Sequence, residues 1–229
     1  MRIAKAIAAS GLASRREAER WIEQGRVQVD GELIDSPALN VSDDSLIEVD
    51  DKPIPAPAKA AIWLFHKPKG VMTTRSDPQG RAVIYDHLPK DAQQLHPVGR
   101  LDLNSEGLLL MTNNGELKRE LELPSTGLER KYRVRVRGCP SKDTLARLTK
   151  GVKIDGMSYR PLKTVVEKKG TNSWLVVTLT EGKNREIRRV FEYFDHPVSR
   201  LIRVSYGQYE LGDLASGKLQ KPTLSLNKP

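Results

Sequence analysis

The most informative stretch of this chain runs from His96 to Glu106 and reads HPVGRLDLNSE. Asp102 follows Arg100 by two positions, and in an extended segment side chains two residues apart point to the same side. A neighbouring guanidinium favours the charged form of a carboxylate, and an ionised, partly dehydrated Asp can act as a nucleophile or a base at neutral pH. The alternative is a purely structural ion pair, which is the more common meaning of such a pair taken alone.

The surrounding sequence favours a functional Asp102 over a purely structural ion pair. HPVGRLDLNSEGLLLMTNNGEL, residues 96–117, resembles the signature of bacterial ribosomal pseudouridine synthases of the RsuA/RluB type. The Asp of Gly-Arg-Leu-Asp is the catalytic residue of that family, so the resemblance implies this role for Asp102. Ser105 replaces the usual Thr and Asn114 the usual Asp; both changes keep the polar character, and neither affects Asp102.

Composition sets outer bounds on function. The 229 residues carry 38 Lys and Arg against 29 Asp and Glu, a formal charge of +9 that favours polyanionic partners through counterion release. Charge alone does not separate nucleic acid from a phospholipid surface, but the chain lacks a basic amphipathic helix with aromatic anchors. No run approaches the roughly 20 apolar residues of a membrane span, and the N-terminus does not read as a secretory signal, so a cytoplasmic location is expected.

Cysteine and histidine usage argues against a metal centre. Cys139 is the single cysteine, which rules out an internal disulfide and a thiolate zinc site. The four histidines are scattered without the spacing of metal ligands. No metal site is expected.

The N-terminal segment predicts two short helices followed by a hairpin. Residues 2–10 form the first helix, Ser14 and Glu17 fit a capping box for a second that ends near Gln24, and Asp30-Gly31 signals a type I′ turn. SGLASRREAERWIEQGRVQVDGELI, residues 10–34, resembles the alpha-L RNA-binding module, whose basic helical face grips folded RNA. A solvated helix face is the alternative for any one cation; as a group, the expected RNA contacts are Arg2, Lys5, Arg15, Arg16 and Arg20.

Proline content places the domain boundary. Three of the five residues 53–57 are proline, so residues 50–60 predict a semi-stiff linker that forms neither a helix interior nor a central strand. We expect the RNA-binding module over residues 1–49, a catalytic domain over 61–220 and a tail over 221–229. The predicted fold class is α+β: a small ααββ module, then a domain with a mixed, mainly antiparallel sheet and flanking helices.

The catalytic domain opens with an apolar run, residues 61–65, that predicts a buried strand. HKPKGVMTTRSDPQGRAVIYDHLP, residues 66–89, also resembles the synthase family, particularly members that act on large-subunit rRNA. Residues 77–80, Asp-Pro-Gln-Gly, signal a turn with an arginine on either side. A solvated loop is the alternative, but phosphate contacts are expected at Lys67, Lys69, Arg75 and Arg81.

Residues 131–137 alternate strictly between cations and apolar side chains, which predicts a strand with two unlike faces. Like charges along one face repel, and a polyanion would relieve the repulsion, so Lys131, Arg133 and Arg135 are candidate RNA contacts. Tyr132 points to the apolar side, where ordinary core packing is the alternative reading. The family resemblance implies that Tyr132 packs against the target base.

Residues 182–191 supply the last element. Asn184 is predicted to cap a helix whose buried stripe includes Ile187 and Phe191. Arg188 lies in the first turns, where a cation opposes the helix dipole and needs an anionic partner, unless it only snorkels at the core edge. The resemblance implies that Arg188 pairs with the catalytic Asp and that Ile187 packs near the floor of the site.

The resemblance thus implies a site-specific rRNA pseudouridine synthase that needs no cofactor, with large-subunit rRNA as the expected partner and a monomeric state. Arg100 is a candidate to fill the space that a flipped base vacates. A small-subunit rRNA or tRNA enzyme is the alternative within the same class. A non-catalytic RNA-binding or ribosome-assembly factor fits the charge and the module, but it leaves the combination of Asp102, Tyr132 and Arg188 unexplained.

Overall fold

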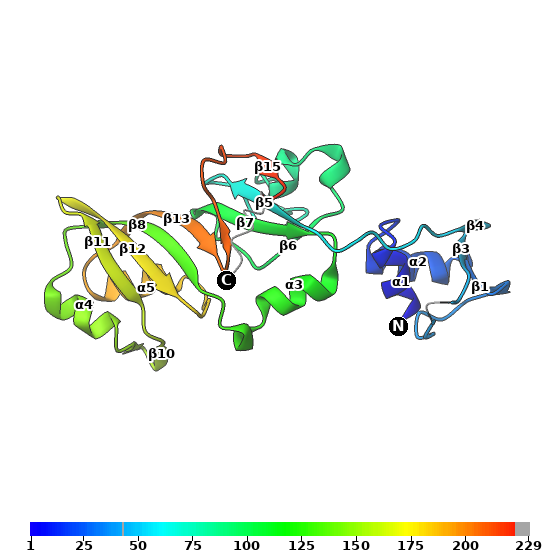
Figure 1. Ribbon diagram of the computed structural model, residues 1–229, viewed down its shortest axis with the longest axis horizontal. Coiled ribbons are helices and arrows are strands. Elements are labelled where there is room, and N and C mark those ends of the chain that lie inside the picture. The colour runs from blue at the N-terminus through cyan, green and yellow to red at the C-terminus, as the bar shows by residue number, and fades with distance from the viewer. Residues whose placement is uncertain (43, 223–229) are drawn as a thin grey trace. The chain divides into compact units, whose positions relative to one another are not determined.

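The structure is a computed structural model that describes residues 1–42 and 44–222 (Figure 1). The chain divides into two compact units: residues 1–61 with 91–96 and 112–117, and residues 62–90 and 97–111 with the chain from 118 on. In the part of the chain that is described, no helix has the length and apolar character that crossing a membrane requires.

The N-terminal module has two helices and a small antiparallel sheet with the order β2-β1-β3-β4. Its elements are α1 (Ile3–Ala9), α2 (Arg15–Glu23), β1 (Val27–Val29), β2 (Glu32–Leu33), β3 (Ile47–Val49) and β4 (Lys52–Pro53). Ser14 caps α2 by accepting a hydrogen bond from the backbone N–H of Glu17 at 3.3 Å, as predicted. Asp30 and Gly31 have φ values of 53° and 83°, which confirms the type I′ hairpin between β1 and β2.

The predicted linker over residues 50–60 begins too early. Asp50 and Asp51 both adopt positive φ and turn the chain into β4, which pairs with β3. Pro53 fits there because β4 is an edge strand, where a missing N–H leaves no ladder partner unsatisfied. Ile54 packs against the module core and donates its backbone N–H to the carbonyl of Ile47 at 3.0 Å. Residues 50–54 therefore belong to the module, and residues 55–60 form no helix or strand.

The second unit is built on a mixed sheet that follows the order β11-β12-β8-β13-β7-β5-β15 through its described strands. The β13–β7 pair is parallel, whereas β11, β12, β8 and β13 pair antiparallel. This arrangement confirms the predicted α+β class. The strands are β5 (Ile62–Lys67), β6 (His96–Pro97), β7 (Glu106–Thr112), β8 (Arg130–Arg137), β11 (Lys163–Lys168), β12 (Asn172–Leu179), β13 (Val198–Tyr206), β14 (Tyr209–Glu210) and β15 (Leu219–Gln220).

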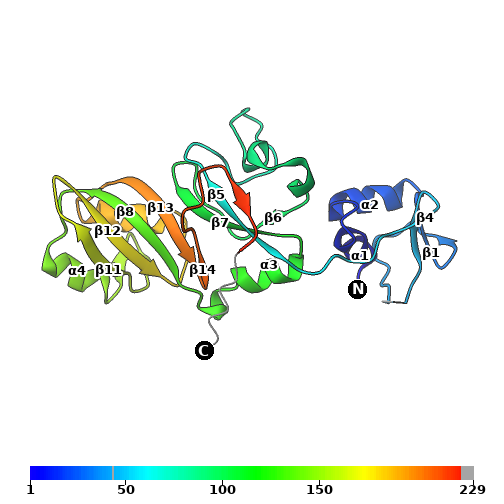
Figure 2. The same ribbon diagram turned by 45° about the horizontal axis from the view of Figure 1, so that its top comes forward.

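Helices cover one face of the β11-β12-β8-β13 half of the sheet. α5 (Glu186–Tyr193) lies behind these strands in Figure 1, and α4 (Lys142–Leu148) and the hairpin of β9 (Val152–Ile154) and β10 (Met157–Tyr159) are drawn below them. The core between the layers holds Val134 and Val136 of β8 against Val190 and Phe191 of α5, all with no exposed surface. In the other half, α3 (Gly115–Glu122) lies near β5 and β7 in both views (Figure 2). Three short 3-10 turns, Ile84–His87, Lys90–Ala92 and Pro124–Thr126, complete the described elements.

Candidate active site

A cleft of about 960 Å³ opens in the second unit and gathers several of the predicted residues. Asp102 and Tyr132 are both half-buried and line it, and Ile187 of α5, almost fully buried, lines it as well. Arg100 is exposed and also belongs to the lining. Four predicted residues from three separate segments of the chain therefore meet at one cavity.

The segment that carries Asp102 is irregular, not an extended strand. Gly99 has a φ of 65°, and the backbone N–H of Ser105 closes a turn by donating to the carbonyl of Asp102 at 3.0 Å. The alternation expected for Arg100 and Asp102 therefore does not apply. Neither a hydrogen bond nor an ion pair joins these two described side chains, so the expected pairing is wrong.

Lys67, at the end of β5, stabilises this turn through hydrogen bonds to its backbone carbonyls. Its side chain has no exposed surface, and its ammonium donates to the carbonyls of Pro68 at 3.0 Å, Asp102 at 3.2 Å and Ser105 at 2.9 Å. A phosphate cannot reach it, so the predicted RNA contact of Lys67 is wrong. Burial lowers the pKa of Lys67 to about 8, although the carboxylates of Asp102 and Glu106 oppose the shift.

The neighbouring carbonyls of the turn are held by donors from the segment after Lys67. The hydroxyl of Thr73 donates to the carbonyl of Leu101 at 2.8 Å, and the backbone N–H of Gly70 donates to that of Leu103 at 2.8 Å. Residues 66–73, which the sequence connected with RNA, thus act here as a support for the Asp102 turn.

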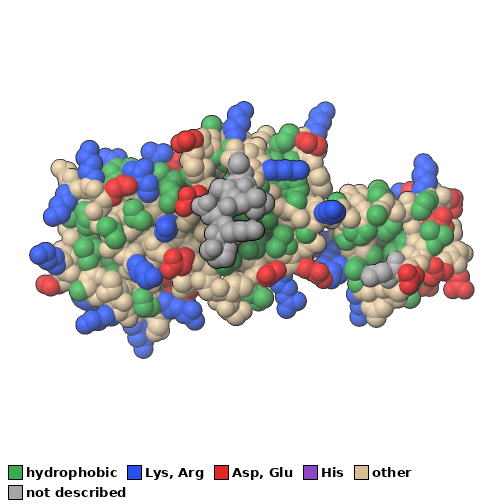
Figure 3. All heavy atoms as spheres, viewed as in Figure 1, with side chains coloured by type: hydrophobic (Ala, Val, Ile, Leu, Met, Phe, Trp, Pro, Cys, Tyr) green, Lys and Arg blue, Asp and Glu red, His purple; other side chains and the backbone are tan. Residues whose placement is uncertain are grey.

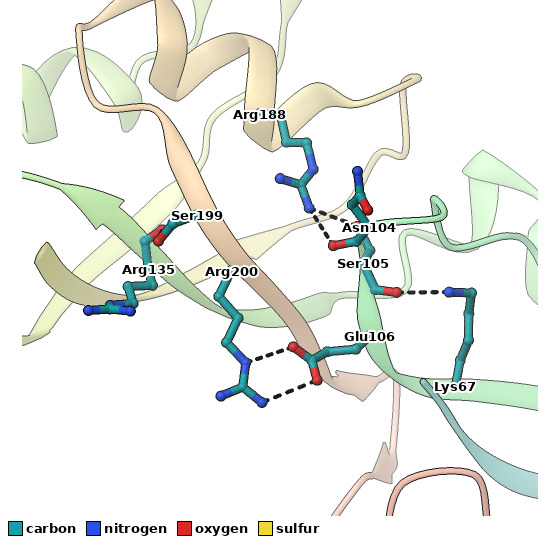
Figure 4. A network of polar contacts seen from close by, with 8 residues as sticks. All are labelled: Lys67, Asn104, Ser105, Glu106, Arg135, Arg188, Ser199 and Arg200. Carbon is teal, nitrogen blue, oxygen red and sulfur yellow. Dashed lines mark hydrogen bonds and ion pairs between the residues drawn. The ribbon is translucent and has the colours of Figure 1, made fainter. Parts of the chain in front are cut away.

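Arg188 completes the support from α5 and does not pair with Asp102. Its guanidinium donates to the carbonyls of Asn104 at 2.7 Å and Val198 at 3.2 Å, as Figure 4 shows for Asn104. The predicted ion pair with Asp102 is absent from the described structure because backbone carbonyls already occupy these donors. Burial and the neighbouring Arg185 lower the pKa of Arg188, whereas Asp102 raises it. The carbonyls of residues 101–105 thus all accept a hydrogen bond.

The start of α5 differs from the prediction. Arg185, with a φ of 52°, stands at the N-cap position that was expected for Asn184. The Glu186 carboxyl instead accepts the backbone N–H of Lys183 at 3.0 Å and is almost completely buried. Burial, followed by the nearby Glu181 carboxylate, raises the pKa of Glu186 to about 8. Arg185 and Glu186 both line the cleft, and the sequence interpretation singled out neither.

A buried cation–aromatic cluster at the cleft was also missed. Arg203 is 2% exposed, donates through Nε to the carbonyl of Leu108 at 2.7 Å, and lies 5.1 Å from the Tyr206 ring. Arg130 lies 4.5 Å from the same ring and donates to the Tyr206 hydroxyl at 2.7 Å. The inward direction of Arg203 was readable, since it shares the strand alternation of the buried Leu201.

The remaining predicted RNA contacts lie on the surface, most of them exposed. Arg81 is bound by Asp77, whose carboxylate accepts its Nε at 2.9 Å and its Nη2 at 2.7 Å, and these bonds lower the pKa of Asp77 to about 2. The Asp77–Gly80 turn is confirmed by the bond from the Gly80 N–H to the Asp77 carbonyl at 3.0 Å. Lys5 is half-buried; the exposed residues are Arg2, Arg15, Arg16, Arg20, Lys69, Arg75, Lys131, Arg133 and Arg135. Within the described residues, no group of three or more His, Cys, Asp or Glu side chains could hold a metal ion.

Comparisons with known proteins agree with this architecture. The family model for RNA pseudouridylate synthases matches residues 61–193, and the model for the S4 domain matches residues 1–47. The chain is 45% identical to an "Uncharacterized RNA pseudouridine synthase" of Rickettsia bellii, over 99% of both chains. It is 34% identical to the ribosomal large subunit pseudouridine synthase B of Bacillus subtilis, over 97% of this chain and 92% of that protein. A crystal structure of a pseudouridylate synthase shares the fold, with a TM-score of 0.69, 24% identity and coverage of 97% and 96% of the two chains.

Proposed function

The chain belongs to the RNA pseudouridylate synthase family, and we propose that it converts one specific uridine of large-subunit ribosomal RNA to pseudouridine. The similarity to proteins named ribosomal large subunit pseudouridine synthase B supports this choice of RNA. The S4 match and the net charge of +9 agree with a folded RNA substrate. The cytoplasm, where ribosomal subunits of bacteria are assembled, is the matching location.

The observation that carries the proposed site is the meeting of Asp102, Tyr132 and Ile187 at one cleft. In the reaction, the bond from N1 of uracil to C1′ of ribose breaks, the base turns, and a bond from C5 to C1′ forms. C5 loses its proton and N1 gains one, so atoms and charge balance. Asp102 acts on the ribose, either as the nucleophile at C1′ or as the base that starts elimination at C2′.

The other lining residues have supporting roles in this proposal. The target nucleotide must leave its stack before chemistry on the base is possible. Tyr132 would pack against the extruded uracil, and Ile187 forms the apolar floor beneath it. Arg100, which is exposed on the cleft lining, would enter the space in the RNA that the base vacates. Lys67 and Arg188 act through the backbone of the turn, so they are positioning residues.

Tritium release from a 23S rRNA transcript labelled at C5 of uracil tests the proposal. Wild-type protein should release tritium, and Asp102→Asn should release none above background. Asp91→Asn, at an exposed position, is the matched control and should behave as wild type. Equal release from Asp102→Asn, with an unchanged Tm, would remove Asp102 from the mechanism.

Nucleotide-resolution mapping decides which RNA is modified. We expect cells that lack the protein to lose one pseudouridine in 23S rRNA and to regain it with the wild-type gene but not with Asp102→Asn. Loss of a site in 16S rRNA or in a tRNA instead would replace the proposed substrate. Full rescue of growth by Asp102→Asn without the modification would favour a ribosome-assembly role.

A further inference from the structure

The two faces of the β11-β12-β8-β13 sheet differ sharply in what they carry. On β8, Tyr132, Val134 and Val136 point toward α5, and Tyr132 continues into the cleft. Because side chains alternate along a strand, Lys131 and Arg135 point away from the cleft, and both are exposed. The β8 cations that were predicted to contact RNA therefore lie on the side of the sheet opposite the target-nucleotide site.

This outer face carries cations that have no partner among the described residues. Lys131, Arg135, Arg137 and Lys168 are exposed, and none of their side chains forms a hydrogen bond or an ion pair with another described residue. Glu167 is the only acidic residue in the four described strands, and it is already bound by Arg133, with Nη2 to carboxylate oxygen at 2.7 Å. The face thus carries uncompensated positive charge.

Apolar side chains run between these cations. Trp174 of β12 lies in register between Arg135 of β8 and Lys168 of β11, and it is half-buried. The guanidinium of Arg133 lies 4.9 Å from the Trp174 ring, and Val165 is 65% exposed. Figure 3, which looks onto this face, shows Lys and Arg side chains spread over these strands with hydrophobic side chains between them.

We propose that this outer face, defined by Lys131, Arg135, Arg137, Lys168 and Trp174, is a second RNA-binding surface that holds a segment outside the target stem-loop. The inference rests on the proposed function, because it takes the substrate to be a large folded RNA. Phosphates satisfy uncompensated Lys and Arg, and an aromatic ring between cations offers contact to a base or ribose. A protein strand docking here would need matching acidic residues, whereas the proposed RNA substrate already supplies negative charge.

The distance between this face and the cleft determines how large an RNA must be to contact both. One sheet and its side chains, about 10 Å thick, separate the face from the cleft. A short hairpin seated in the cleft does not extend around the sheet edge, whereas a large rRNA fragment does. The surface therefore contributes to binding of long RNA and leaves the reaction on a minimal hairpin unchanged.

The double variant Arg135→Gln/Arg137→Gln tests the proposal on the full-length protein. Its control, Lys142→Gln/Lys150→Gln, removes the same charge from exposed positions on and just after α4, in the helical layer. The probes are a 23S rRNA transcript and a short hairpin that carries the mapped uridine. The measurements are equilibrium binding over a series of salt concentrations and kcat/KM for tritium release.

A plot of log binding constant against log salt concentration has a negative slope. For the transcript, the arginine variant should make this slope shallower by about 1.5, since each phosphate contact contributes about 0.7–0.9. Its kcat/KM on the hairpin should equal that of wild type, and the lysine control should match wild type throughout. An unchanged slope, or an equal loss on the hairpin, overturns the proposal. If wild type releases no tritium but the arginine variant still has a shallower salt dependence, the RNA-binding surface is supported and the proposed function is wrong.

Discussion

The Lys67 side chain is buried, and its ammonium donates hydrogen bonds to three backbone carbonyls. Two of these carbonyls belong to the turn that carries Asp102. Methionine fills a similar volume without the donors, so Lys67→Met leaves the Asp102 and Ser105 carbonyls short of a partner. We expect kcat for tritium release to fall about 10- to 100-fold with little change in KM, because a small shift of Asp102, the proposed catalytic group, is costly. Lys90→Met, at an exposed position outside the predicted RNA contacts, is the control; equal kcat values for the two variants would contradict this role.

The pH dependence of the same group has a defined sign. The pKa of Lys67 in the folded protein, about 8, lies below the ordinary lysine value of 10.5. As the pH rises, the folded protein therefore loses this proton before the unfolded protein does, so the free energy of unfolding rises between about pH 8 and 10.5. Deprotonation also removes one of the three N–H donors of the Lys67 ammonium. We expect wild-type kcat to decline as the pH rises through about 8 and the Lys67→Met variant to lack this decline. A wild-type rate that stays flat to pH 9 would argue against it.

Sequence patterns predicted single residues unevenly. Asp102, Tyr132 and Ile187 meet at one cleft because strand and helix periodicity fixes the direction of the last two. The direct pairing of Arg188 with Asp102 was not found, because carbonyls of the irregular turn compete for the guanidinium, and one-dimensional patterns do not reveal such acceptors. The burial of Lys67 was missed for a similar reason: a lysine next to a turn reads as a surface residue.

At the scale of elements, the parallel contact between β7 and β13 depends on a glycine. Gly107 has a φ of 105°, and a Cβ added there would lie 2.3 Å from the backbone oxygen of Arg203. Gly107→Ala must therefore push β7 and β13 apart. We expect the free energy of unfolding to fall by about 3 kcal/mol or more, from overpacking added to backbone strain.

Urea unfolding with a matched glycine checks this expectation. Gly212 also has positive φ, 51°, but a Cβ there meets nothing within 4 Å. For Gly212→Ala, the free energy of unfolding should fall by only about 1 kcal/mol, which is the strain of the left-handed conformation alone. Similar losses in the two variants would mean that the strands move apart easily.

Elements with strong local signals were predicted well from the sequence. The Asp30-Gly31 hairpin and the capped α2 formed as expected, since their signals reside in a few adjacent residues. The start of α5 was misjudged, because Arg185 rather than Asn184 occupies the cap and the Glu186 carboxyl supplies the bond. The burial of Glu186 at the cleft depends on residues far away in the sequence, so it has no signature in the local sequence.

At the scale of the whole molecule, the chain has separate hydrophobic cores. Ile22 belongs to the module core and Phe191 to the core between sheet and helices, each with no exposed surface. Truncating Ile22 or Phe191 to Ala removes about 2–5 kcal/mol from its own core. Ile22→Ala should therefore speed hydrogen exchange within residues 1–54 and leave β8 and β13 protected, while Phe191→Ala should do the reverse.

Hydrogen exchange with mass spectrometry resolves these regions separately. Faster exchange of β8 in the Ile22→Ala variant would show that the cores unfold as one cooperative unit. The division itself was predicted from the prolines near residue 55, but its edge was placed too early. An edge strand that contains Pro53 resembles a linker in composition, and only its pairing with β3 reveals it as structure.

Five successive carbonyls, from residue 101 to 105, are already engaged before any RNA arrives. Such a loop is preorganised: it has few alternative arrangements left, and association demands little entropy loss from it. In the proposed reaction, the conformational change then falls on the nucleic acid, which would bring an extruded nucleotide to the Asp102 carboxylate. Selectivity among uridines would accordingly reflect how readily each one escapes its helix, more than any moulding of protein around the base.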